Sequence, residues 1–271
     1  MKKHRPLTSF LALAGSAALI ALAGCGGSDG FFDDDDDPIN DVFAATNGNR
    51  LMRLSKNGFD TVNDVAITGL AVGETIRGMD FRPANSQLYA LGSTGQLYTL
   101  DTATGAATAV GAPLAITGTA VGFDFNPSVD RIRIITDEEE NLRVNPDTGD
   151  LAATDTALTP ASFYVGAAYT PAGAGNPTTL FAIDAGTNRL VLQGGVDGTP
   201  SPNGGVMTVV GPLLFDASTT CGFDIDTSGN AYVLTLNGGG TSSIYRLDLQ
   251  SGEGEKLDDF AFGITAMAVL T

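Results

Sequence analysis

The sequence predicts an all-β protein, a single β-propeller of five four-stranded blades closed by pairing of its N- and C-terminal segments. Three observations lead to this fold. A glycine-led segment recurs along the chain, each full copy carries several short apolar strands, and the two ends supply complementary parts of one further copy. The composition agrees, because 35 Gly and 12 Pro with only 17% charged residues are typical of short strands joined by tight turns.

A glycine marks the first strand of each copy. The first four of these glycines are separated by 44, 44 and 56 residues, and loops at 171–176 and 197–205 account for the longest interval. About 40–50 residues suffice for the four antiparallel strands of a propeller blade. One blade cannot bury both faces of its sheet, so the blades must stack around an axis. The leading glycines are Gly78, Gly122, Gly166, Gly222 and Gly263.

Each of the four full copies holds three clear strands, and a weaker fourth strand is evident in some of them. The first copy contains strands at 78–83, 87–91, 96–101 and, more weakly, 107–110; the second at 122–127, 131–135 and 141–145; the third at 166–171, 179–183, 189–192 and, more weakly, 207–210; and the fourth at 222–226, 231–234 and 243–248. A β-sandwich or a β-solenoid is the alternative. A sandwich would not show this near-regular repeat, and a solenoid would not need complementary ends.

The ends of the chain predict how the ring closes. Residues 263–268 begin a copy that then runs out of chain. Residues 42–45 and 50–54 supply strands that this copy lacks. Joined, the two ends make a fifth blade, a clasp that many propellers use.

Two segments of the second copy carry a resemblance to a known family. GFDFNPSVDRIR at 122–133, followed by NLRVNPDTG at 141–149, resembles the domain of unknown function called DUF4394. The resemblance covers residues 41–271, and the other copies match it more loosely. It implies a propeller-like fold. It implies no activity and supplies no catalytic residues.

The N-terminus predicts a bacterial lipoprotein. A short basic stretch precedes residues 7–23, which are almost wholly apolar or small, as in a secretory signal peptide. The following LAGC at 22–25 resembles a lipobox, in which the cysteine sulfur takes a diacylglycerol. We therefore expect residues 1–24 to be a signal peptide and Cys25 to be the lipidation site. The alternative is an ordinary signal peptide that ends beside a chance cysteine.

Residues 25–40 predict a flexible acidic tether between a lipid anchor and the propeller at 41–271. They combine Gly- and Ser-rich sequence with five consecutive aspartates, a composition that cannot bury a core. The acyl chains on Cys25 would make the membrane a stable partner. By resemblance to lipoproteins of bacteria with two membranes, Gly26 in place of Asp favours the outer membrane. We expect a lipid-anchored protein of the bacterial cell envelope.

Composition excludes several function classes. Loss of residues 1–24 removes three of the 14 basic residues and none of the 31 acidic ones, which leaves a net charge of −20. Nucleic acid is a poor partner for such a chain. The one histidine, His4, leaves with the signal peptide, so triads that use imidazole are excluded. Cys221 matches valines in neighbouring copies and is expected to be a buried small hydrophobe.

Three aspartates occupy the same place in three copies. Asp80, Asp124 and Asp224 each lie two residues after a leading glycine, on the strand expected to be innermost. Around the axis they are candidates for holding a hard cation such as Ca²⁺. The competing interpretation is that each carboxylate bonds backbone amides within its own blade. Ala168 and Thr265 are expected at the corresponding places in the other two copies, which leaves the ring incomplete.

Three arginines gather in the second copy. Arg131, Arg133 and Arg143 form a local positive patch, and the first two share one face of a strand. Such a patch is a candidate site for a carboxylate or phosphate ligand. The competing interpretation is ion pairing with the neighbouring acidic residues Asp130, Asp137 and 138–140.

Together these patterns favour a cell-envelope lipoprotein with a non-catalytic propeller, acting as a binding or scaffolding module for a protein, glycan or small molecule. Without a histidine in residues 25–271 or a catalytic motif, the balance leans away from an enzyme. One alternative is a Ca²⁺-dependent hydrolase or lactonase-like propeller that uses the three aspartates. The other is a purely structural envelope protein. No cofactor is expected beyond the candidate Ca²⁺.

Overall fold

The computed structural model describes residues 41–55 and 57–270. The predicted signal peptide, the lipidation site at Cys25 and the acidic tether lie outside the described residues. Within the described part of the chain, no helix has the length and apolar character needed to cross a membrane.

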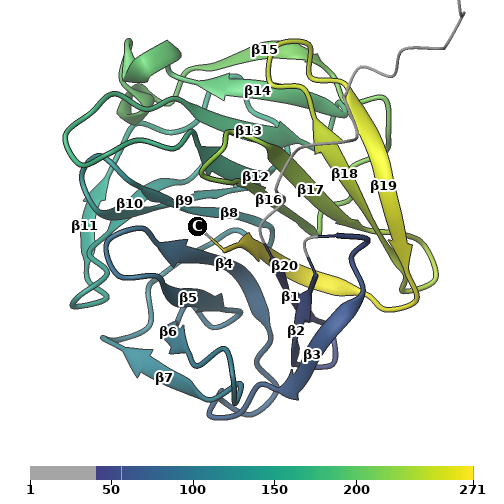
Figure 1. Cartoon of the computed structure of the whole chain (residues 1–271). Helices are drawn as coiled ribbons and strands as arrows, with labels where there is room; N and C mark the ends of the chain where they lie inside the picture. Colours follow the sequence, from purple (N-terminus) through teal and green to yellow (C-terminus); the bar gives the residue numbers. More distant parts are fainter. Residues whose placement is uncertain (1–40, 56, 271) are drawn as a thin grey trace, which may run out of the picture. The chain divides into compact units, whose positions relative to one another are not determined.

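The described chain forms five four-stranded antiparallel sheets arranged as a five-bladed β-propeller (Figure 1), which confirms the predicted fold class. We name each blade by its innermost strand. The blades are β4 (Ile76–Arg82), β5 (Gln87–Gly92), β6 (Leu97–Leu100) and β7 (Ala107–Val110); β8 (Val121–Asn126), β9 (Arg131–Thr136), β10 (Asn141–Val144) and β11 (Leu151–Thr154); β12 (Tyr164–Tyr169), β13 (Leu180–Asp184), β14 (Arg189–Gln193) and β15 (Met207–Pro212); β16 (Cys221–Ile225), β17 (Ala231–Leu236), β18 (Ser242–Leu247) and β19 (Gly254–Phe260); and β20 (Ile264–Val269), β1 (Val42–Thr46), β2 (Arg50–Leu54) and β3 (Thr61–Ala66).

The ring closes through the two ends of the propeller, as predicted. The innermost strands contact one another in the cyclic order β4, β8, β12, β16 and β20. β20 pairs antiparallel with β1, with Val42 opposite Val269 and Ala45 opposite Ala266. In Figure 1 the yellow β20 lies beside the purple β1. The last strand of the propeller therefore forms the innermost strand of the blade that the first three strands begin.

The leading glycines allow the innermost strands to approach one another closely. A Cβ atom at Gly78 would lie 2.5 Å from the Cβ of Phe123, and one at Gly122 would lie 2.7 Å from the backbone nitrogen of Ala167. Real Cβ atoms essentially never lie this close to another heavy atom. The repeated glycine thus reflects close packing between blades.

The same contact corrects the register of the fifth copy. Phe123 and Ala167 each follow a leading glycine directly, and the residue that faces Gly222 in this way is Met267, 2.4 Å from a Cβ placed on that glycine. The counterpart of the leading glycine in β20 is therefore Ala266, and the prediction of Gly263 was wrong by three residues. Alanine in place of glycine removed the signal by which the register could have been found.

The core consists of apolar layers between adjacent blades. One layer joins the β20 and β4 blades through Phe43, Met79, Phe81 and Ala268. The rings of Phe43 and Phe81 meet edge to face, with centroids 5.2 Å apart. The fourth strands β3, β7 and β11 are largely exposed, because they lie at the rim of the propeller. Their weak apolar patterns in the sequence follow from that position.

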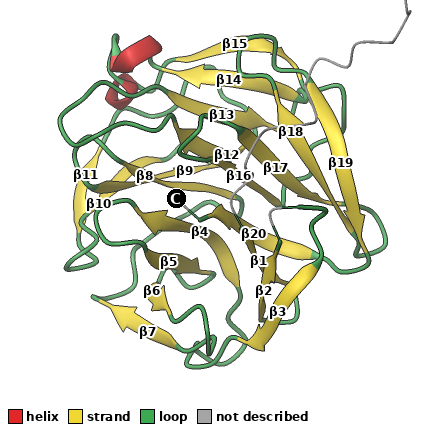
Figure 2. Cartoon of the chain, in the orientation of Figure 1, coloured by secondary structure: helices red, strands yellow, loops and turns green. Residues whose placement is uncertain are grey.

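The connection between β14 and β15 departs from the repeat. It contains two short 3₁₀ turns, η1 (Val196–Gly198) and η2 (Pro202–Gly204), drawn in red in Figure 2. This is the loop predicted at 197–205. It joins the neighbouring β8 blade through a backbone hydrogen bond of 3.1 Å from Thr156 N–H to the carbonyl of Asn203. The insertion thereby covers an edge between two blades.

Candidate functional site

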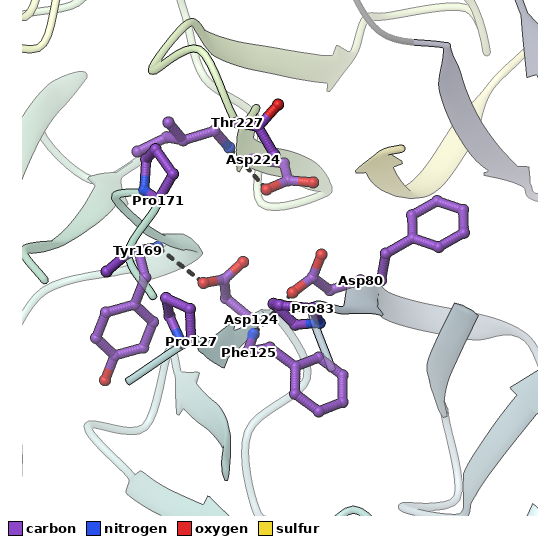
Figure 3. A pocket seen from close by; sticks show the side chains of 12 residues that line it. Asp80, Pro83, Asp124, Phe125, Pro127, Tyr169, Pro171, Asp224 and Thr227 are labelled. Atoms are coloured by element: carbon purple, nitrogen blue, oxygen red, sulfur yellow. Dashed lines mark hydrogen bonds between the residues drawn. The ribbon is translucent and has the colours of Figure 1, made fainter. Parts of the chain in front are cut away.

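Three carboxylates meet on the propeller axis. Asp80, Asp124 and Asp224 come from the innermost strands β4, β8 and β16, and all three side chains are buried. One carboxylate oxygen from each lies within 4.8 Å of those from the other two. Figure 3 shows the three side chains turned toward a common space. We call these residues the axial carboxylates.

Each axial carboxylate also joins its blade to the next one. Asp80 Oδ2 accepts a hydrogen bond of 2.7 Å from Phe125 N–H, and Asp124 Oδ2 accepts one of 2.8 Å from Tyr169 N–H. Asp224 Oδ2 accepts one of 2.6 Å from Val269 N–H. The competing interpretation from the sequence placed such bonds within a single blade. In the structure these three bonds run between blades, and the competing interpretation holds for one further bond, from Ile225 N–H to Asp224 Oδ1 within the same blade.

In the other two blades an alanine occupies the position of the axial carboxylate. Ala168 and Ala268 occupy the positions at which the pattern would place a carboxylate. The prediction of Thr265 for the last blade was therefore wrong. The Thr265 hydroxyl instead donates to the Ala45 carbonyl at 3.2 Å. A carboxylate at position 168 would accept a hydrogen bond from Ile225 N–H. In its absence Asp224 Oδ1 accepts that bond, at 2.7 Å. Of the five equivalent positions around the axis, three therefore carry an aspartate and two carry an alanine.

Burial raises the pKa values of all three axial carboxylates. Removal from water raises the pKa of Asp80 to about 6. Burial, followed by the negative charges of Asp80 and Asp224, raises the pKa of Asp124 well above its ordinary value. Burial, followed by the charge of Asp80, does the same to the pKa of Asp224. Three close carboxylates repel one another when they are ionised, and this favours retained protons or a bound cation.

The axial carboxylates face a small pocket at one end of the axis. Its volume is about 80 Å³, and its wall includes Pro83, Pro127, Pro171, Tyr169 and Thr227. Its lining residues within the described chain include no lysine or arginine. The charge of the triad is therefore not balanced by any basic group on the pocket wall.

Apolar residues separate this pocket from the opposite end of the axis. Met79, Phe123, Phe223 and Met267 surround a space of about 10 Å³ in the middle. Beyond them, a second pocket of about 220 Å³ is lined by threonines and Arg77. The two ends of the axis therefore differ in chemistry.

The predicted arginine patch divides in the structure. Arg133 is buried at 1% exposure, and Arg143 lies beside it; both pair with Asp155, at 2.8 Å in each case. Arg131 stands apart and donates to the carbonyl of its neighbour Asp130 at 2.7 Å. The structure thus brings together two of the three arginines.

The predicted acidic partners of these arginines were wrong. The Asp130 carboxylate pairs with Arg82 of the β4 blade at 2.5 Å. Asp137 and Glu140 accept hydrogen bonds from backbone N–H groups of the loop before β8. Asp155, which lies just after β11, does the pairing instead. Nothing in the local sequence indicated it, because it meets the arginines only once the blade has folded.

Cys221 is buried, as predicted. Burial raises the pKa of its thiol to about 12, so the thiolate is disfavoured at neutral pH. This agrees with its expected role as a small hydrophobe.

Comparisons with known proteins give a family and loose structural likenesses. Residues 50–269 match the family model described as "Domain of unknown function (DUF4394)". No curated protein matches the sequence. A protein of unknown function from Bacteroides caccae is similar, with 12% identity over 86% of this chain and 99% of that one and a TM-score of 0.49.

Two further solved structures resemble the chain at the same 12% identity over 86% of its length. One is a structural genomics protein of unknown function from Bacteroides thetaiotaomicron VPI-5482, with 65% of that chain covered and a TM-score of 0.49. The other is the dihydro-heme d1 dehydrogenase NirN in complex with DHE, with 56% covered and a TM-score of 0.38. Likenesses this loose carry no argument about function. The family match covers most of the sequence, and the chain belongs to the DUF4394 family, whose function is unknown.

Proposed function

We propose that this protein is a non-catalytic binding module of the cell envelope whose axial pocket holds a hard divalent cation, with Ca²⁺ as the best match. The observation that carries the proposal is the convergence of the axial carboxylates to within 4.8 Å of one another. Ca²⁺ binds oxygen ligands at about 2.4 Å, so two of its ligands lie at most about 4.8 Å apart. The three carboxylates therefore fit around one ion.

The charge and chemistry of the pocket support a cation. The three oxygens are hard ligands, and a divalent ion would offset most of a buried triple negative charge. Backbone N–H groups already hold each carboxylate in place, so little ordering remains for the ion to induce. Water would complete the six to eight ligands that Ca²⁺ takes.

A binding role is favoured over hydrolysis by the lining of the pocket. Apart from the axial carboxylates, the one titratable side chain on the described wall is Tyr169. Its hydroxyl already accepts a hydrogen bond from Arg133 at 3.2 Å. A hydrolase would need a general base within reach of the proton it abstracts, and with the axial carboxylates committed to the ion the described wall offers no other carboxylate or imidazole.

The place of action belongs to the same proposal. The lipobox-like segment supports a lipid anchor at Cys25, an outer-membrane location and an envelope partner that is a protein, glycan or small molecule. We expect a Cys25→Ser chain to lack the mass of the lipid and to leave the membrane fraction. Unchanged mass and fractionation would contradict the anchor without touching the cation site.

Calorimetric Ca²⁺ titration of the chelator-treated Cys25→Ser chain tests the binding function. One ion per chain should bind, with an affinity of roughly 10⁻⁴ M or tighter. Asp124→Asn should abolish binding. Asp147→Asn is the matched control, because it removes the same charge from an exposed side chain that pairs with Arg82. Absence of binding at millimolar Ca²⁺ would reduce the triad to a set of links between blades.

A further inference from the structure

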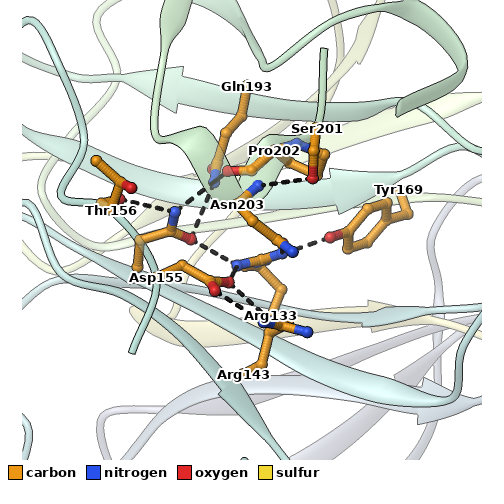
Figure 4. Close-up of polar contacts among 10 residues, drawn as sticks. Arg133, Arg143, Asp155, Thr156, Tyr169, Gln193, Ser201, Pro202 and Asn203 are labelled. Carbon is orange, nitrogen blue, oxygen red and sulfur yellow. Dashed lines mark hydrogen bonds and ion pairs between the residues drawn. The ribbon is translucent and has the colours of Figure 1, made fainter. Parts of the chain in front are cut away.

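A second polar pocket lies between the β8 and β12 blades, away from the axial carboxylates. It measures about 240 Å³ and is lined by Arg133, Arg143, Tyr169, Asn203 and other residues. Arg133 and Arg143 come from β9 and β10, Tyr169 ends β12, and Asn203 belongs to the insertion between β14 and β15. We call it the arginine pocket. Figure 4 shows its polar contacts.

Arg133 organises the wall of the arginine pocket. Its Nε donates to the Tyr169 hydroxyl at 3.2 Å, and its Nη2 donates to Asn203 Oδ1 at 2.7 Å. Its Nη1 donates to Asn141 Oδ1 at 2.6 Å and to Asp155 Oδ2 at 2.8 Å. A buried guanidinium is thus bonded on all three nitrogens, and its neighbours act toward it as acceptors.

This arrangement leaves donors facing the pocket. Because Asn203 uses its oxygen on Arg133, its amide N–H₂ is turned to other partners, and the Tyr169 hydroxyl keeps its hydrogen to donate. Arg143 binds Asp155 through Nε and Nη2, each at 2.8 Å, which leaves Nη1. Within the described chain no residue accepts a hydrogen bond from these three groups. These three donors therefore favour a ligand group that accepts hydrogen bonds.

The local charge bears on which acceptor the pocket can take. Two guanidiniums share the single carboxylate of Asp155, which leaves one positive charge in a chain whose net charge is −17. The one carboxylate among the described lining residues is Asp197, which comes from the insertion. Its negative charge offsets the remaining positive one, so the charged groups of the pocket sum to zero and disfavour a dianion. A monoanionic carboxylate matches this balance better than a phosphate does.

We propose that the arginine pocket binds a small carboxylate through Arg143 Nη1, Asn203 Nδ2 and the Tyr169 hydroxyl. A volume of 240 Å³ admits a molecule of the size of a hydroxy acid. Apart from Tyr169, which lines both pockets, the residues of this site are separate from the axial carboxylates. It therefore extends the binding function to a second ligand class.

Titration with sodium lactate, followed through the arginine Nε–H resonances at constant ionic strength, tests the site. Lactate should shift the Arg133 and Arg143 signals saturably. Asn203→Asp should weaken lactate at least tenfold, because it keeps an acceptor for Arg133 while replacing the free donor by a charge. Its thermal midpoint should not fall, which separates lost binding from lost folding.

Arg131→Gln is the matched control, since it removes a positive charge from the same blade at a residue outside the pocket. Its affinity for lactate should equal that of the unmodified chain. Equal lactate binding by the Asn203→Asp chain, or no saturable shift in the unmodified chain, would overturn the site. Tighter binding of inorganic phosphate than of lactate would overturn the carboxylate assignment. None of these outcomes depends on Ca²⁺, so this proposal and the cation site fail independently.

Discussion

The axial pocket and the arginine pocket each contain buried charged side chains, but they balance charge in opposite ways. On the axis, three carboxylates meet without a basic residue on the pocket wall, and burial raises the pKa of each. Between the blades, two arginines share Asp155, and that carboxyl has its pKa lowered, because hydrogen bonds and charges from both arginines outweigh its burial. The axial carboxylates have no basic partner on the pocket wall. The two arginines, by contrast, are paired with Asp155, and hydrogen-bond donors remain free beside them.

The two pockets also meet in one residue. Tyr169 lines both of them. Its backbone N–H donates to Asp124, and its hydroxyl accepts from Arg133. A single residue thus lets the two sites be perturbed together or apart.

Removing the clasp should have the largest effect and abolish both sites. Deletion of residues 262–271 takes away β20, and with it the N–H that Asp224 accepts and the innermost strand of one blade. The ring then cannot close, and we expect the whole propeller to unfold, including the β8 and β12 blades that β20 does not belong to. Circular dichroism during heating measures this. A truncated chain that still melts cooperatively at the native temperature would contradict it.

Breaking the arginine pocket should cost more at Arg133 than at Arg143. Arg133→Met leaves Asn203 Oδ1 without its donor and takes one donor each from Asn141 and Asp155, which keep Gln193 and Arg143. This should lower the free energy of unfolding by roughly 1–3 kcal/mol. Arg143 is a third exposed, and Arg143→Gln should cost about 1 kcal/mol at most. Urea unfolding of the two variants compares them. Equal losses would mean that Arg133 does not organise the wall.

Changing pH should act on the axial carboxylates in the opposite sense to an ordinary ion pair. Their folded-state pKa values are raised, so between about pH 4 and the folded pKa the native state keeps protons that the unfolded state has released. Without metal, the free energy of unfolding should therefore fall as the pH rises from 5 to 8, and Ca²⁺ should restore it more at pH 8.

Asp124→Asn isolates this pH effect. The amide is neutral at every pH and still offers an oxygen to Tyr169 N–H, so the metal-free variant should melt above the unmodified chain at pH 8 and lose the response to Ca²⁺. Thermal melts with chelator and with Ca²⁺ provide the measurement. A variant that is less stable than the unmodified chain at pH 8 would show that the triad is not strained by its charge.

The smallest expected effect separates the two sites at their shared residue. Tyr169→Phe removes the hydroxyl and keeps the backbone N–H, so it should cost about 1 kcal/mol and weaken lactate binding. Ca²⁺ affinity should stay unchanged, as calorimetry of the same sample can check. A loss of Ca²⁺ binding would mean that the two pockets are coupled through this side chain.

The sequence could predict the axial site because that site is built from equivalent positions of a repeat. Asp80, Asp124 and Asp224 share one offset from a glycine, and innermost strands must meet at the axis of any closed ring. The register of the last copy was predicted wrongly by three residues. β20 has Ala266 where the other blades have glycine, and the nearby Gly263 was taken for the leading glycine.

The arginine pocket could be predicted only in part, because much of it lies outside the repeat. Arg133 and Arg143 stood out as basic residues in an acidic chain. Their partners come from places that share no pattern with them: Asp155 follows β11, and Asn203 belongs to an insertion that one blade alone carries. Contacts of this kind are fixed by tertiary packing, which no local periodicity encodes.

The clasp also has a consequence in time. A ribosome releases the strands of the propeller from β1 onward, at about 5–20 residues per second. The pairing of Ala45 with Ala266 must then wait for more than two hundred residues to be made. Until β20 emerges, β1 exposes an unpaired edge, and the N–H that Asp224 will accept does not yet exist. The propeller is therefore completed by its final strand, and a chain interrupted late in synthesis carries an open ring.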